Sequence, residues 1–280
     1  MDNNKRIRPK QPGFVLITDS YQKYVMMNYG ISHFYQFEAA SDLMVAIPDA
    51  CVDILFCMDK KMTKGLIAGS LLQMSDVLTE QRSTYFGVRF LPGYNPVESI
   101  AKVEELIEKQ ESFTDMLRFS RQEELLEQIR CASTFEERVG LFLQYYLKNS
   151  GCHLKDPLEL KQYLRNEINL CGGDIQLNDL QQKTCYSARY LNRIIHEEFG
   201  LAPKELLRIL RFQSAIDKMT TWSEEENLTE AALSSGYYDQ SHFIREFRRF
   251  TNDTPKTYKK QLMDKSYKER LKIVKQEVLH

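Results

Sequence analysis

The stretch SARYLNRIIHEEFGLAPK (187–204) aligns without a gap with a second stretch, DQSHFIREFRRFTNDTPK (239–256). The offset is constant at 52 residues, 239 against 187, and it sets Arg193 against Arg245. In both copies apolar residues recur at i, i+4 and i+7 or i+8, which indicates an amphipathic helix, and basic residues occupy another side. One such helix is common, but two in matching frames indicate a single structural motif used twice.

Each copy also carries the signals that begin and end a helix. Ser187 and Asp239 stand at the same position, and both residue types are good N-caps. The two copies end at Gly200 and Asn252, the residue types that best tolerate a left-handed backbone conformation. A proline then starts another helix in both copies.

A short helical stretch and a tight turn precede each copy. They are NDLQQKT with Cys185-Tyr186 before the first copy, and LTEAALSS with Gly236-Tyr237-Tyr238 before the second. Helix, turn and a second helix with an exposed polar side is the helix-turn-helix plan. Two ordinary helical hairpins would explain the apolar stripe but would leave the arginines without a role.

The segment PKELLRILRFQSAIDKM (203–219) between the copies has an uninterrupted helical pattern. Its length as a helix is ~25 Å at a rise of ~1.5 Å per residue. With the half-widths of the flanking units this gives a separation near ~34 Å, one turn of B-DNA. The two basic helices are therefore predicted to enter successive major grooves.

These motifs resemble the DNA-binding domain of AraC-type transcriptional regulators over residues 157–262. The resemblance is carried by S-x-R-Y-L-x-R (187–193), F-G-x-x-P-K (199–204), Arg211 with Ala215, G-Y-x-D-Q-S-H-F-x-R-x-F-R-R (236–249) and T-P-x-x-Y (254–258). The sequence departs from the family pattern at Gln181, at Cys185 where a turn glycine is common, and in the longer loop TTWSEEEN.

The resemblance implies which side chains meet DNA. Arginine suits a guanine edge and asparagine or glutamine suits an adenine edge, whereas other cations contact phosphate. The implied DNA-binding residues are Ser187, Arg189, Asn192, Arg193, His196, Gln240, Ser241, His242 and Arg245, with Arg248, Arg249 and Lys256 as phosphate contacts. For the two histidines, a capping or packing role is an equally good interpretation.

The N-terminal third is predicted to consist of strands. Runs such as FVLIT, CVDILFCM and YFGVRFLPG are bounded by Pro, Gly, Asp and Lys, with no helical stretches between them. An α+β chain is expected, with an antiparallel β-sandwich followed by an all-α domain of two helix-turn-helix units joined by a long helix. The predicted divisions are a β-rich sensor domain (1–95), a helical connector (96–150), the DNA-binding domain (157–262) and a basic helical tail (263–280).

PDACVDILF (48–56) and FGVRFLPG (86–93) resemble the cupin-like sensor half of one branch of the same regulators. That resemblance implies a small-molecule effector bound by the sandwich and dimerising helices after it. Candidate ligand residues are Asp53 and Arg89, polar within apolar strands, with Phe34 and Phe37; mutual pairing of Asp53 and Arg89, and a core role for the aromatic residues, are the alternatives. The helical stretches 97–109 and 135–147 are candidate homodimer surfaces, with packing against the sandwich as the alternative.

Composition limits the remaining classes. Among the five histidines only His33 lies in the strand region, so neither a metal site nor a cofactor is expected, and no phosphate loop or nucleophile elbow indicates an enzyme. The absence of a signal peptide or an apolar span predicts a cytoplasmic protein. The net charge is −1 overall, but residues 242–275 carry 11 Lys+Arg against 4 Asp+Glu, which favours polyanionic partners.

Double-stranded DNA is thus the expected partner, joined by a small-molecule effector, a second copy of the chain, and RNA polymerase if the regulator activates. Two alternatives stay open at this point. One is a ligand-binding or catalytic sandwich with a degenerate helical tail. The other is an interaction protein whose helical part sequesters another regulator, which the acidic run Glu224–Glu226 slightly favours.

Overall fold

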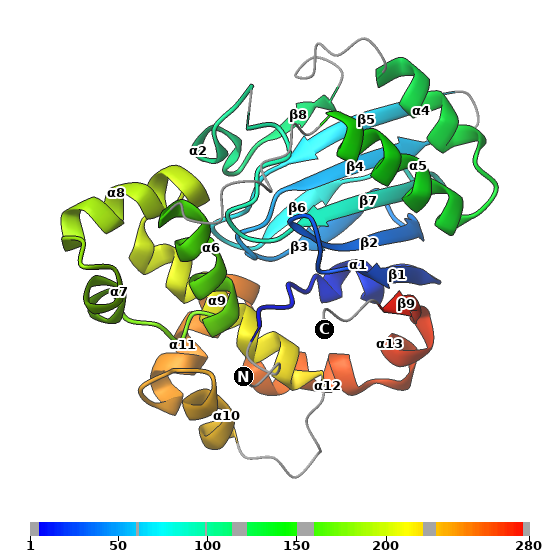
Figure 1. Cartoon of the computed structure of the whole chain (residues 1–280). Helices are drawn as coiled ribbons and strands as arrows, with labels where there is room; N and C mark the ends of the chain where they lie inside the picture. Colours follow the sequence, from blue (N-terminus) through cyan, green and yellow to red (C-terminus); the bar gives the residue numbers. More distant parts are fainter. Residues whose placement is uncertain are drawn as a thin grey trace.

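A seven-stranded sheet forms the N-terminal part of the chain, and helices form most of the rest (Figure 1). The computed structural model describes residues 6–59, 62–98, 100–113, 122–149, 160–220 and 228–276. Most of the predicted domain boundary at 148–157, the loop after 219 and the acidic run at 224–226 lie outside these ranges. The expected order, strands first and helices after, is confirmed.

The large sheet has the strand order β8-β5-β4-β7-β2-β1-β9, and every neighbouring pair is antiparallel except β1 with β9. Strands β3 and β6 form a separate antiparallel ribbon. The strands are β1 (Tyr21–Val25), β2 (Ile31–Glu38), β3 (Leu43–Ala46), β4 (Asp53–Met58), β5 (Thr63–Ala68), β6 (Ser75–Leu78), β7 (Thr84–Phe90), β8 (Gln110–Ser112) and β9 (Leu271–Gln276).

Both faces of this sheet are buried, which is why its strands are almost continuously apolar. On one face Phe34 packs against Phe142 of α5 (Phe135–Asn149), with ring centroids 5.9 Å apart, and α4 (Gln122–Cys131) lies beside α5. On the other face Phe37 packs against Phe14 of α1 (Pro12–Leu16) at 5.8 Å. Alternate residues of β2 therefore belong to two different hydrophobic clusters.

The helices of the C-terminal part are α6 (Leu160–Cys171), α7 (Leu177–Thr184), α8 (Ala188–Phe199), α9 (Pro203–Met219), α10 (Leu228–Ser234), α11 (Gln240–Thr251), α12 (Pro255–Met263) and α13 (Lys265–Arg270). The predicted helix at 203–219 coincides with α9. In Figure 1 α9 lies between the sheet and the other helices of this region.

The prediction of a helical stretch over 97–109 was wrong for most of its length. Only α2 (Val103–Leu106) is helical, and β8 follows it and pairs with β5. Ala101 and Val103 are both buried, although residues two places apart cannot share one face of a helix. The backbone at Glu108 has a positive φ of 58°, and β8 begins two residues later. Burial of these apolar side chains against the sheet overrides the local helical pattern.

The C-terminal tail was predicted to be helical over 263–280, and this was wrong beyond Arg270. Residues Leu271–Gln276 form β9, which pairs in parallel with β1 at the edge of the sheet. The side chain of Lys275 lies over the Tyr24 ring, 5.3 Å from its centroid. The hydrogen bonds of an edge strand stabilise the extended form here, and a pairing partner about 250 residues away leaves no local signal.

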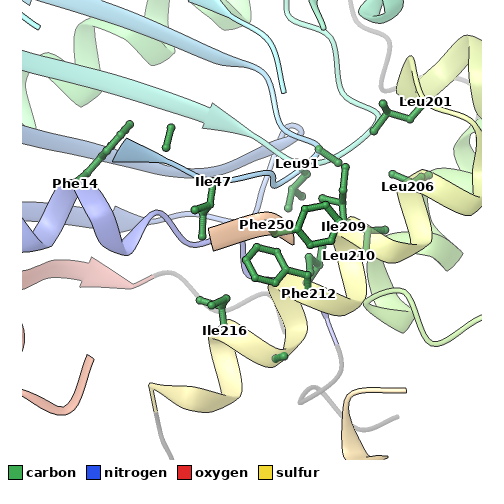
Figure 2. Packing of buried hydrophobic residues seen from close by; sticks show 14 of the residues in the cluster. Phe14, Ile47, Leu91, Leu201, Leu206, Ile209, Leu210, Phe212, Ile216 and Phe250 are labelled. Atoms are coloured by element: carbon green, nitrogen blue, oxygen red, sulfur yellow. The ribbon is translucent and has the colours of Figure 1, made fainter. Parts of the chain in front are cut away.

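Buried amide groups join α9 to the sheet region. Gln213 has no exposed surface; its oxygen accepts a hydrogen bond from the Lys10 N–H (2.8 Å), and its nitrogen donates to the Pro48 carbonyl (2.7 Å). Nearby, Lys10 forms an ion pair with Asp217 of the same helix at 2.9 Å. Figure 2 shows Ile47 and Leu91 of the sheet region beside Phe212 and Phe250 of the helices. The two regions thus share one continuous core.

Replacing Gln213 with alanine is expected to lower the free energy of unfolding by about 1–3 kcal/mol, because it leaves the Pro48 carbonyl and the Lys10 N–H buried without partners. Urea denaturation of the whole chain measures this. Gln144→Ala, an exposed site on α5, is the matched control and should change stability by less than about 0.5 kcal/mol. Equal stability of the two variants would contradict the proposed anchoring role of Gln213.

Candidate nucleic-acid interface

Two helical units with the same local geometry follow one another in the C-terminal region. The first consists of α7 and α8, and the second of α10 and α11. Ser187 caps α8 by accepting a hydrogen bond from the Tyr190 N–H (3.3 Å), and Asp239 caps α11 by accepting from the His242 N–H (2.7 Å). The predicted N-caps are confirmed, and the constant 52-residue frame extends to their geometry.

The turns and the ends of the units also correspond. Gly200 and Asn252 end α8 and α11 with φ values of 69° and 54°. Gly200 is required twice over, since a Cβ there would lie 2.8 Å from the Glu104 nitrogen of α2. In the first turn Cys185, where the family pattern favours glycine, adopts φ 59°. The departure at this position is therefore accommodated without a change of backbone conformation.

The apolar side of each second helix is buried and its basic side is exposed. Leu191 and Phe199 of α8 and Phe243 and Phe247 of α11 are buried. The predicted DNA-binding residues Ser187, Arg189, Asn192, Arg193, His196, Ser241, Arg245, Arg248, Arg249 and Lys256 are exposed, whereas Gln240 and His242 are half-buried. Exposed cations on a helix anchored by its other side can meet the phosphates and base edges of DNA.

Comparison with known proteins places this region in a family. Residues 180–261 match the sequence profile described as "Helix-turn-helix domain". Uncharacterized HTH-type transcriptional regulators of Staphylococcus aureus strains MSSA476 and MRSA252 are 29% identical over 86 residues, which is 31% of this chain and 11% of theirs. The chain therefore spans only about a ninth of the length of these relatives.

Residues 180–261 form an AraC-type helix-turn-helix domain. Solved structures with some likeness include ToxT from Vibrio cholerae, at 14% identity and a TM-score of 0.42, covering 87% of this chain and 98% of that one. A Listeria innocua protein of unknown function is 27% identical with a TM-score of 0.33, covering 36% of this chain and 96% of that one. A DNA-binding role is the established property of this domain type.

The cations of the helix-turn-helix domain differ in how far carboxylates already engage them. Among the described residues, no carboxylate lies within ion-pairing distance of Arg189, Arg245 or Arg248. In contrast, Arg249 is bound to Glu205 of α9 (Nη2–Oε1 3.1 Å). A free guanidinium can bind DNA without first breaking an internal ion pair. Arg245 is therefore better placed for binding than Arg249.

The two histidines are each close to a carboxylate. His196 Nδ1 is 3.3 Å from Glu104 Oε2 of α2, and His242 Nε2 is 3.6 Å from the buried Glu246 Oε1. Glu246 also binds Arg208 of α9. The packing interpretation of the histidines thus has definite partners, and the acidic partners Glu104 and Glu205 were missed because they come from other elements.

The sheet region contains the other predicted site residues. A cavity of about 300 Å³ is lined by Asp49, Asp53, Arg89, Tyr35 and Gln11 together with apolar side chains. Phe37 is on the same face of the sheet but does not line the cavity, and Phe34 lies in the core on the opposite face. Of the four predicted ligand residues, the structure brings Asp53 and Arg89 together at this cavity and places Phe34 away from it.

Arg89 is the centre of the polar group in this cavity. Its Nε lies 2.8 Å from Asp53 Oδ1 and its Nη1 lies 3.2 Å from Asp49 Oδ2, with the side chain 3% exposed. Burial lowers the pKa of Arg89, but the two carboxylates outweigh it and hold the pKa above its ordinary value. Burial likewise raises the pKa of Asp49, although Arg89 opposes it. Mutual pairing of Asp53 and Arg89 is thus observed, and Asp49 was missed by the sequence analysis.

Two further findings limit the chemistry available. No group of three or more His, Cys, Asp or Glu side chains in the described part of the chain is arranged to hold a metal ion. None of the described helices has the length and apolar character needed to cross a membrane.

Replacing Arg245 with alanine is expected to weaken binding to a selected DNA duplex by about 1–3 kcal/mol and to relax preference at one base, because a free base-contacting guanidinium is lost. Arg249→Ala is the matched comparison and should weaken binding less, since Glu205 already occupies that side chain. Titration of labelled duplexes with each purified variant measures both effects. Arg245→Ala binding as tightly and as selectively as the unmodified chain would contradict the placement of α11.

Proposed function

We propose that the chain is a sequence-specific, DNA-binding transcriptional regulator that acts in the cytoplasm and is not an enzyme. The observation that carries the proposal is the pair of exposed arginines, Arg193 and Arg245, at equivalent positions of two capped amphipathic helices. Arginine donates two hydrogen bonds to a guanine edge in the major groove, the commonest base-specific contact in protein–DNA complexes.

The connection between the units favours recognition of two neighbouring segments. Helix α9 has 17 residues and is uninterrupted from Pro203 to Met219. This corresponds to ~25 Å of helix, and ~34 Å with the flanking half-widths, which is close to one turn of B-DNA. We propose that α8 and α11 enter successive major grooves on one side of the duplex.

The sheet region is proposed to regulate DNA binding through a small-molecule effector in the cavity around Arg89. Gln11 supports this because it lines the cavity and donates a hydrogen bond to Asp49 Oδ2 at 2.9 Å. Its neighbour Lys10 is bonded to Gln213 and Asp217 of α9. A ligand that displaces Gln11 would therefore act on the helix that carries both units.

Further partners follow from the same proposal. A second copy of the chain is proposed to dock on the outward side of α5, where Gln144 and Leu147 are exposed. RNA polymerase is a partner if the regulator activates transcription.

Selection of bound sequences from random duplexes tests the proposed function most economically. The unmodified chain should enrich two short blocks about one helical turn apart. Arg193→Ala should abolish enrichment of one block, and Arg245→Ala should abolish enrichment of the other. A single enriched block would show that one unit is idle, and no enrichment at all would contradict the proposal.

The affinity for the selected duplex should fall steeply as the salt concentration rises, because cations that neutralise phosphates release counterions. Binding measured at several salt concentrations gives the slope, and Lys256→Ala should reduce the slope by about one. A flat salt dependence would exclude the proposed phosphate contacts.

A further inference from the structure

Three side chains form a stack on the exposed side of the first two turns of α8. The Tyr186 and Tyr190 rings are nearly parallel, with an angle of 25° and centroids 4.9 Å apart. The guanidinium carbon of Arg193 lies 5.0 Å from the Tyr190 ring centroid. Positions 186, 190 and 193 share one side of a helix, since residues three and four places apart are neighbours on its surface.

We propose that this stack positions Arg193 for base recognition, so that Tyr190 is a positioning residue for the sequence preference of the first unit. The inference rests on the proposed DNA-binding function and adds to it a determinant of specificity. Tyr190 does not contact a base in this proposal; it acts through the side chain of Arg193.

The geometry suits this role because stacking uses the face of the guanidinium and leaves its edge free. A base is bound through the N–H groups on the edge, and guanine accepts two of them at O6 and N7. The carboxylate near Arg193 is that of Glu197, whose Oε1 is 3.8 Å from Nε. The Arg193 side chain is 62% exposed, and no ion pair to its terminal Nη atoms is present among the described residues. A long flexible side chain that is already ordered loses less entropy on binding.

The second unit has the same kinds of residue in the same frame but not the same stack. The equivalent positions are Tyr238, His242 and Arg245. The His242 ring instead packs edge-on against Tyr237 at 5.5 Å, and Tyr238 is 88% exposed. No aromatic ring in the described ranges lies beneath Arg245. The two units therefore differ: the first presents an ordered arginine, and the second presents one with more freedom.

Tyr190 also packs against the hydrophobic core, so a change at this position can affect stability. The test must therefore measure base preference, which a purely structural role would leave unchanged in the folded fraction. It uses the full chain and a duplex selected by the unmodified protein, together with versions in which each guanine of the first block is replaced in turn.

Tyr190→Leu is expected to reduce discrimination between guanine and other bases at one position of the first block by about two- to fivefold, the effect of losing an exposed cation–π contact. Tyr190→Phe retains the ring and should retain the discrimination. Tyr238→Leu is the control in the second unit and should leave preference in the first block unchanged. If Tyr190→Leu fails to fold, Tyr190→Met supplies the same comparison with a good helix former.

The outcomes separate the two proposals. Selective binding by the unmodified chain with equal guanine discrimination in the leucine, methionine and phenylalanine variants would overturn the positioning role and leave the proposed function standing. Absence of any selective binding by the unmodified chain would overturn the proposed function and the positioning role with it. Loss of discrimination in the leucine or methionine variant, with retention in the phenylalanine variant, supports the inference.

Discussion

Burial of α9 is the constraint on which the rest of the structure depends. Phe212 of this helix packs against Phe250 and Phe247 of α11, with ring centroids 4.9 and 5.4 Å apart, while Gln213 beside it is bonded to the N-terminal segment. Leu206 and Ile209 are also fully buried. A helix that is covered on several sides cannot move relative to its neighbours without opening the core, so the two basic helices and the sheet are held as one packed arrangement.

The sequence predicted what depends on local periodicity and end signals. The 52-residue frame, the N-caps at Ser187 and Asp239, and the extent of α9 all follow from residue types within a few positions of each other. The strand-rich first third was predictable for the same reason. What could not be predicted depends on distant partners: β9 pairs with β1, and burial against the sheet breaks the helical pattern around Ala101 and Val103.

The same distinction applies to the candidate sites. Exposure of Arg193 and Arg245 follows from the helical pattern, because the opposite side of each helix must be buried. The carboxylate that engages Arg249 comes from α9, and the one beside His196 comes from α2, so the sequence gave no indication of either. In the sheet, pairing of Asp53 with Arg89 was one of two open interpretations, and Asp49 was not considered because a turn separates it from β4.

Protection of guanine N7 from methylation, measured along a duplex bound by the unmodified chain, tests the central claim most directly, since N7 lies in the major groove. Two guanidinium-bearing helices separated by α9 should protect guanines in two clusters about ten base pairs apart, on one side of the duplex. Protection of a single cluster, or of clusters on opposite sides of the duplex, would contradict the account.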